Sequence, residues 1–284
     1  MDTAAQVKQE RPAALRDLPP FPGVALRLLT LLDRSNVTVQ DIEQVLRMDA
    51  ALSAKILRIA NSAFYASRYP IDSLQQATVR LGIMGLKRTA LTVALGGLMS
   101  GRGKNQALQQ CWHHSVAGAL ISEELAKMLG QSPDRAYTAG LLHDIGRLGL
   151  LACYPDRWQG MLEVANRHGI GELEAERDLF GIDHCAAGRW LAKDWNLPEE
   201  FVDAIENHHT AEIRDASLLS IVTAANTLAN VLGYDTFDLE RTETIAEVIE
   251  GLPLKDRPQA VERIEGLRDT IHNALSAFAP GGRA

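Results

Sequence analysis

The stretch Gly140-Leu-Leu-His-Asp-Ile-Gly-Arg147 sets a histidine and an aspartate side by side in an apolar run bounded by glycine. Adjacent residues on a regular helix point about 100° apart, so His143 and Asp144 can serve one site only if the helix bends or ends there. Gly146 and Gly149 allow such a bend. Because an imidazole beside a carboxylate suits a metal ion or a positioned proton transfer, this stretch is the first candidate for chemistry.

Four further histidines lie on apolar or small-residue lines of predicted helices: His114, His184, His208 and His209. A single inward histidine is usually a hydrogen-bonded core residue, and a histidine pair that ends a helix can instead respond to the helix dipole. Several such positions between residues 114 and 209 favour a shared site over those alternatives. His168 and His272 lie in polar surroundings and are predicted at the surface.

Charge and composition exclude several classes of protein. Lysine and arginine number 29 against 36 acidic residues, a formal net charge of -7, which disfavours binding to nucleic acid or to an anionic membrane by charge alone. The three cysteines form no paired motif and show no cationic context, so we expect inert thiols in a reducing cytoplasm rather than a disulfide scaffold. No apolar run reaches the ~18 residues that a membrane-spanning helix needs.

Apolar residues recur at helical spacing through most of the chain and strict polar–apolar alternation is absent, so the sequence predicts an all-α fold. A polar break at 101–104 divides a bundle of short helices over 15–100 from longer helices over 104–232; a flexible tail at 1–14 precedes them and a helical extension at 233–284 follows. The longer helices are predicted over 106–129, 133–153, 156–168, 172–178, 184–195, 198–209 and 216–232, with a last one from about 258. The apolar stripe of that last helix is predicted to pack on the same chain, with a homodimer contact as the alternative.

Several short stretches of the sequence are informative when they are taken together. They are Leu18-Pro-Pro-Phe-Pro22, Asp49-Ala-Ala-Leu-Ser-Ala-Lys-Ile-Leu57, Arg58-Ile-Ala-Asn-Ser-Ala-Phe64, Leu81-Gly-Ile-Met-Gly-Leu86, Trp112-His-His-Ser115, the run from Gly140 to Gly146, Asp183-His184, and Trp195-Asn-Leu-Pro198 leading to His208-His209. Together they resemble the HDOD group, the HD-related output domain of bacterial signalling proteins, which is part of the HD superfamily of metal-dependent phosphohydrolases. The resemblance spans about residues 15–232.

The resemblance implies an all-helical domain in which an N-terminal helical bundle leans on an HD-like half. In HD enzymes a helix histidine, the His-Asp pair and a later aspartate hold the metal, and His114, His143 and Asp144 match the first three. His184, His208 and His209 resemble the additional histidines of two-metal relatives such as the HD-GYP cyclic-dinucleotide phosphodiesterases.

Two positions depart from the HD pattern. Asn226 stands where the later aspartate belongs, and Arg147 stands where many HD enzymes carry a lysine. Nothing after His209 resembles a GYP signature. A metal ion that activates water needs anionic ligands, and Asp144 is then the only matched carboxylate. Nitrogen-rich ligands suit zinc, iron or nickel better than magnesium or manganese.

We therefore expect a cytoplasmic output module of bacterial signal transduction that acts through protein partners, with no membrane or nucleic-acid partner. It has a degenerate metal position at Asn226, requires no cofactor and carries no catalytic residue. A divalent zinc, iron or nickel ion could bind at the matched positions, which are His114, His143, Asp144, His184, His208 and His209. The alternative is a metal-dependent phosphohydrolase or cyclic-nucleotide phosphodiesterase, in which Asp144 and Arg147 are catalytic and Arg147 steadies phosphate.

Overall fold

The computed structural model describes residues 13–16, 18, 23–31, 37–65, 70–97, 105–158, 165, 169–236 and 243–278. Over these residues the chain is all-α, as predicted, and contains no strand. None of the described helices is both long and apolar enough to cross a membrane. Most of the predicted tail, the predicted break at 101–104 and most of the predicted helix over 156–168 lie outside the described residues.

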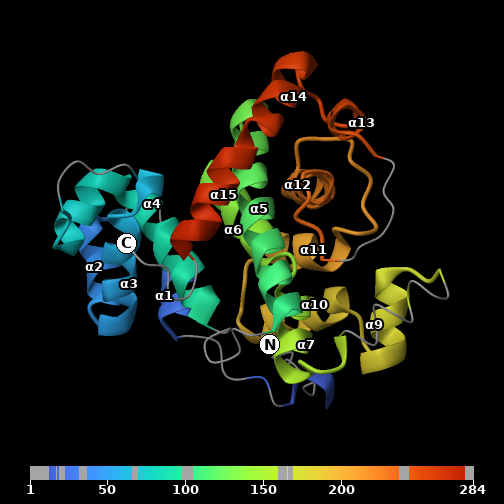
Figure 1. Cartoon of the computed structure of the whole chain (residues 1–284), viewed down its shortest axis with the longest axis horizontal. Coiled ribbons are helices and arrows are strands. Elements are labelled where there is room, and N and C mark those ends of the chain that lie inside the picture. Colours follow the sequence, from blue (N-terminus) through green and yellow to red (C-terminus); the bar gives the residue numbers. More distant parts are fainter. Residues whose placement is uncertain are drawn as a thin grey trace, which may run out of the picture.

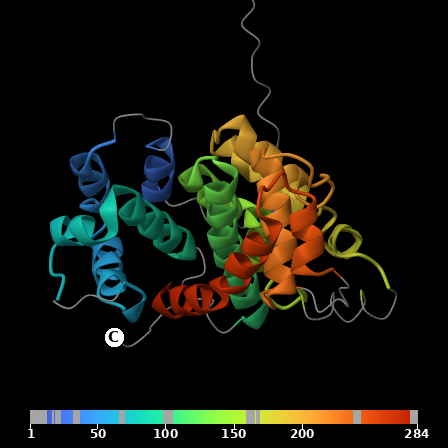
Figure 2. The same cartoon turned by 90° about the horizontal axis from the view of Figure 1, so that it is seen from above.

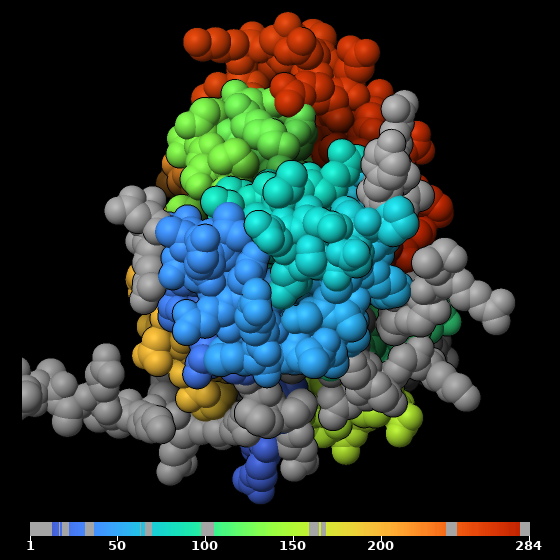
Figure 3. All heavy atoms as spheres, turned by 90° about the vertical axis from the view of Figure 1, so that its left-hand side faces the viewer, coloured from blue at the N-terminus to red at the C-terminus, as the bar shows by residue number. Residues whose placement is uncertain are grey.

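Four helices form the N-terminal bundle, on the left of Figure 1: α1 (Gly23–Thr30), α2 (Val39–Leu46), α3 (Ala50–Ala60) and α4 (Leu74–Gly96). Capping fixes their starts, since Thr38 forms a capping box with Asp41 and the side chain of Asp49 accepts a hydrogen bond from the first turn of α3. Helix α4 contains a kink at Gly82, whose φ of 71° suits glycine. Figure 3 shows the continuous surface that this bundle presents.

The second half is built around α5 (Gln106–Leu129), which α6 (Pro133–Leu142) and α12 (Leu218–Val231) pack against. Its other helices are α7 (Ile145–Cys153), α9 (Glu172–Phe180), α10 (His184–Asp194) and α11 (Glu199–Asn207). The prediction of a single helix over 133–153 is wrong, because the chain turns at His143 and Asp144 between α6 and α7. The bend that a shared His-Asp site requires is therefore present.

Glycines let the helices of this half approach closely. A Cβ placed on Gly140 would lie 2.7 Å from the carbonyl oxygen of Gly118, so α5 and α6 meet backbone to backbone. At Gly146 it would meet the backbone of His184 and of Gly188, which joins α7 to α10 in the same way. These two crossings bring the histidines of α5, α6 and α10 toward one centre.

The C-terminal extension consists of α13 (Ile245–Glu250), α14 (Arg257–Glu265) and α15 (Leu267–Phe278). The single helix predicted from about 258 is wrong, since two helices meet at Gly266. The predicted packing on the same chain is confirmed: Ile264 and Ile271 are buried with residues of α5 and α12. Helix α15 continues past α5 to contact α4, so it lies against both halves (Figure 2).

An ion network joins α4 to the second half. Arg88 of α4 pairs with Glu123 of α5 and lies 3.1 Å from Asp134 of α6. We expect Arg88→Met to lower the free energy of unfolding by about 1–2 kcal/mol at neutral pH, measured by urea unfolding. Burial opposes the ionisation of Glu123, but hydrogen bonds from Arg88 and Lys127 outweigh it and lower the pKa of that carboxyl.

The sign of the pH dependence follows from that lowered pKa. The ionised Glu123 stabilises the fold above its ordinary pKa of 4.5, and this contribution is lost as the pH falls through the lowered pKa. The difference between Arg88→Met and the parent should therefore shrink in acid. Arg47→Met, which removes an exposed pair with Glu43, is the control and should cost about 0.5 kcal/mol or less. Equal costs for the two variants would contradict the network.

Candidate functional site

The turn between α6 and α7 directs two adjacent side chains into the core. His143 ends α6 and Asp144 begins α7, and both are buried almost completely. On α5, His114 is equally buried, and its Nε2 lies 3.1 Å from Nε2 of His143. Each of these two nitrogens lies 3.8 Å from Oδ2 of Asp144. The structure thus brings together the three residues that match the HD pattern.

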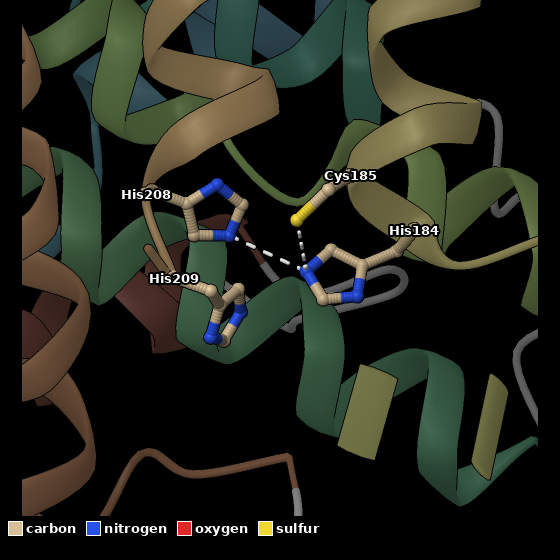
Figure 4. A group of neighbouring side chains, drawn as sticks. All are labelled: His184, Cys185, His208 and His209. Atoms are coloured by element: carbon tan, nitrogen blue, oxygen red, sulfur yellow. Dashed lines mark hydrogen bonds between the residues drawn. The ribbon is translucent and has the colours of Figure 1, made fainter. Parts of the chain in front are cut away.

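A second histidine group lies on the other side of Asp144. It contains His184, the first residue of α10, and His208 and His209 at the end of α11 (Figure 4). Nε2 of His184 lies 3.3 Å from Nε2 of His208. Oδ1 of Asp144 lies 3.3 Å from the first of these nitrogens and 3.5 Å from the second. Asp144 therefore presents one oxygen to each histidine group.

Backbone carbonyls orient three of the rings. Nδ1 of His114 donates to Tyr234, Nδ1 of His143 to Gly140, and Nδ1 of His208 to Ile205, over distances of 2.7, 2.7 and 2.9 Å. In a neutral ring the proton then resides on Nδ1, and the Nε2 lone pair points inward. Burial lowers the pKa of both His114 and His143, so these imidazoles are neutral and ready to bind a cation.

Arg147 lies in the middle of the cluster and is fully buried. It donates to Oδ2 of Asp144 over 3.0 Å, to Glu176 over 3.0 Å and to Glu172 over 2.9 Å. Burial opposes the ionisation of Asp144, but the charge of Arg147 outweighs it and holds the pKa of Asp144 well below its usual range. Asp144, the carboxylate that lies between the two histidine groups, is thus already paired with a protein cation.

Two acidic residues of this network escaped the sequence reasoning. Glu172 and Glu176 lie four residues apart on one face of α9, and Glu176 is completely buried. The sequence predicts Asp144 as the only carboxylate that matches the HD pattern, and the structure places these two further carboxylates against Arg147. The signal that could have found them is this i, i+4 spacing just before Asp183, which caps α10.

Carboxylates also hold the outer nitrogens of the second group. Nδ1 of His184 donates to Glu176 over 2.6 Å, and Nδ1 of His209 lies 3.1 Å from Glu172. Burial and Arg147 oppose the protonation of His184, but Glu176 and other nearby negative groups outweigh them and raise its pKa. Burial and the positive charge of neighbouring groups lower the pKa of His209.

The residues present fit a divalent transition metal. Oδ1 of Asp144 and Nε2 of His209 are buried and have no hydrogen-bond partner. The lone pairs of His114 and His143 face each other at 3.1 Å, an arrangement that a cation or a proton relieves. Oδ1 of Asn226, from α12, lies 2.9 Å from Nε2 of His114. This oxygen can serve as a ligand of an ion beside His114, but it lacks the negative charge of a carboxylate.

A pocket of about 370 Å³ reaches the cluster from the surface. His208, His209 and Asn226 form part of its wall on one side, and Glu243 and Glu247 of the C-terminal extension line it on the other. Among the described residues, no lysine or arginine lines this pocket. The entrance is therefore acidic.

A helical domain with a buried His-Asp pair at a helix break, surrounded by histidines from three other helices, defines an HD-type domain. The sequence model of the HDOD domain matches residues 18–211, and the chain belongs to the HDOD family. The predicted resemblance is confirmed.

Similar solved structures cover nearly the whole chain. An HDOD domain protein of unknown function from Geobacter sulfurreducens is 25% identical with a TM-score of 0.76, covering 93% of this chain and 94% of that one. A protein described as "Putative phosphohydrolase" from Shewanella amazonensis is 27% identical with a TM-score of 0.73, covering 94% and 99%.

Curated relatives are longer than this chain. An uncharacterized protein of Treponema pallidum is 26% identical over 225 residues, which are 78% of this chain and 44% of that protein. Ribonuclease Y of Thermotoga petrophila is 28% identical over 155 residues, 55% of this chain and 24% of that enzyme. The chain thus spans less than half the length of these relatives.

Proposed function

We propose that this HDOD chain is a regulatory module of bacterial signal transduction that acts by contacts with other proteins and does not hydrolyse phosphate esters. The position of Arg147 carries the proposal. Its guanidinium engages Asp144, the carboxylate that lies between the two histidine groups. A hydrolytic metal centre needs that charge to hold the ion and to ready a water molecule.

Two further features weaken a hydrolytic site. Asn226 supplies an amide where the HD pattern has a second carboxylate, so among the residues that the structure describes Asp144 is the anion of the first histidine group. Glu243 and Glu247 line the pocket, and their charge repels a phosphate anion that approaches the histidines. The site thus lacks a second carboxylate beside the histidines, while carboxylates line the pocket that leads to it.

A second function is favoured by one observation, the placement of Asp144 with one oxygen toward each histidine group. This geometry suits a metal-dependent phosphohydrolase or cyclic-nucleotide phosphodiesterase. The matched histidines and Asp144 would hold the metal, which supplies Lewis acidity and lowers the pKa of bound water. Arg147 would then steady phosphate, but in the structure its donors are engaged by Asp144, Glu172 and Glu176.

The test is hydrolysis. The full chain, loaded separately with zinc, iron(II), manganese and nickel, is mixed with bis-p-nitrophenyl phosphate and with cyclic dinucleotides. We expect no release of p-nitrophenol or linear dinucleotide above the buffer rate, because Asp144 remains paired with Arg147. The measurements are absorbance for the first substrate and chromatography for the second.

The control is Asp144→Asn, which removes the inner carboxylate. Turnover by the parent that Asp144→Asn abolishes would overturn the proposal in favour of the phosphohydrolase. Turnover that persists in this variant would indicate a contaminating enzyme. Asn226→Asp tests whether the missing negative charge at this position weakens the site, since the added charge should tighten metal binding at His114 and His143.

A further inference from the structure

Cys185 lies inside the second histidine group, although its sequence context predicted an inert thiol. It is buried at the start of α10, next to His184. Figure 4 shows its sulfur directed at the His184 ring, and Sγ lies 3.5 Å from Nε2 of that ring. Each of the four residues His184, Cys185, His208 and His209 offers one ligand atom within 4.8 Å of the other three.

Two distances within this group match those between ligands of a tetrahedral zinc ion. Bonds of about 2.05 Å to nitrogen and about 2.3 Å to sulfur separate two nitrogens by about 3.3 Å and a nitrogen from a sulfur by about 3.6 Å. The structure has 3.3 Å between Nε2 of His184 and Nε2 of His208, and 3.5 Å between Nε2 of His184 and Sγ of Cys185. Nε2 of His184 therefore lies at a ligand-to-ligand distance from both of the other two atoms.

The outer contacts of the imidazoles are those of metal ligands. Glu176 accepts a hydrogen bond from Nδ1 of His184, Ile205 accepts one from His208, and Glu172 lies 3.1 Å from Nδ1 of His209. Such carboxylate and carbonyl partners orient the ring and make its other nitrogen more basic. Nε2 of His209 is buried without a hydrogen-bond partner, so a ligand position remains open on that ring.

We propose that Cys185 is a metal ligand and that, with His184, His208 and His209, it forms a closed, four-coordinate site for zinc. Four protein ligands are typical of structural zinc sites, whereas a catalytic site keeps one position for water. The pocket beside His208 and His209 provides the entry path, and its acidic residues favour a cation. This inference goes beyond the proposed function, because the thiolate would bind zinc whether or not the protein is catalytic.

Cobalt(II) reports the sulfur ligand directly. The zinc-free 284-residue chain is titrated with cobalt, and the absorption spectrum is recorded. We expect stoichiometric binding, intense visible bands of a tetrahedral ion and a near-ultraviolet sulfur-to-cobalt charge-transfer band. Cys185→Ser should lose that band and weaken zinc binding at least about tenfold, the lower end of the loss seen when only an outer partner of a ligand is removed. Circular dichroism confirms that the variant is folded.

Cys153→Ser is the matched control, because Cys153 ends α7 and is not among the four residues. It should keep the charge-transfer band. Three outcomes would overturn the proposal: the parent binds no cobalt, it binds cobalt without the band, or the band survives in Cys185→Ser. None of these depends on turnover, so a failure here is distinct from a failure of the proposed function.

Discussion

Gly146→Ala is expected to lower the free energy of unfolding by at least about 3 kcal/mol, a large share of the stability of an ordinary domain. The added methyl group would collide with the carbonyl oxygen of His184 and the backbone nitrogen of Gly188, and would lie 2.9 Å from Cα of Gly188. Backbone atoms cannot rotate away as a side chain can. Helices α7 and α10 must therefore separate, which also pulls His184 away from Asp144.

Gly149→Ala is the matched control on the same helix. The three atoms nearest to its methyl group would belong to the side chains of Leu15, Leu18 and Leu191, at ordinary contact distances of 3.4–3.5 Å. Alanine also favours a helix interior over glycine, so the change in stability should stay within about 1 kcal/mol. Urea unfolding gives the free energy of unfolding of both variants for comparison with the parent. Similar stabilities of Gly146→Ala and Gly149→Ala would show that the α7–α10 crossing is not as close as described.

Arg147→Met is the second large effect, and we expect a loss of about 3–5 kcal/mol in the metal-free protein. The variant leaves Asp144, Glu172 and Glu176 without the cation that all three contact. A buried charge whose partner is removed keeps its desolvation cost and loses the compensating attraction. Methionine fills much of the same volume, so the loss reports charge and hydrogen bonding more than a cavity.

Arg177→Met provides the comparison from α9. Arg177 is exposed and its pair with Asp183 lies at the surface, so its loss should cost about 1 kcal/mol or less. Chemical unfolding after exhaustive treatment with a chelator gives both values. If Arg147→Met were as stable as Arg177→Met, another positive group would have to neutralise the buried carboxylates, and the pairing of Arg147 with Asp144 would no longer support a non-hydrolytic site.

Helix positions and most of the metal-ligating candidates were predictable from local sequence. Helix α5 begins and ends where the periodicity of residues 106–129 predicts, because Asn105 caps it and Gly130 adopts the left-handed conformation at its end. The inward direction of His114 and Asn226 also follows from helical spacing, since each continues an apolar line. The break at His143–Asp144 could be foreseen only as a requirement of the chemistry.

Contacts between distant helices were not predictable in this way. Glu172 and Glu176 belong to the cluster because α9 packs beside Arg147 and His184. Cys185 follows His184 in sequence, and adjacent helix residues usually diverge. The start of α10 lets both approach the same point, which depends on where α11 lies. These contacts depend on how distant helices pack, which local sequence patterns do not predict.

The path of α15 has a mechanical consequence. Ala274 and Ala277 of this helix share one hydrophobic core with side chains of α4 and α5. The N-terminal bundle and the histidine-bearing half are therefore packed together and are not joined by a linker alone. Because close-packed interiors transmit strain, a displacement of one half is passed to the side chains that it packs against. The C-terminal helix packs the two halves into one hydrophobic core, so a displacement of either half has to be accommodated by the packing of the other.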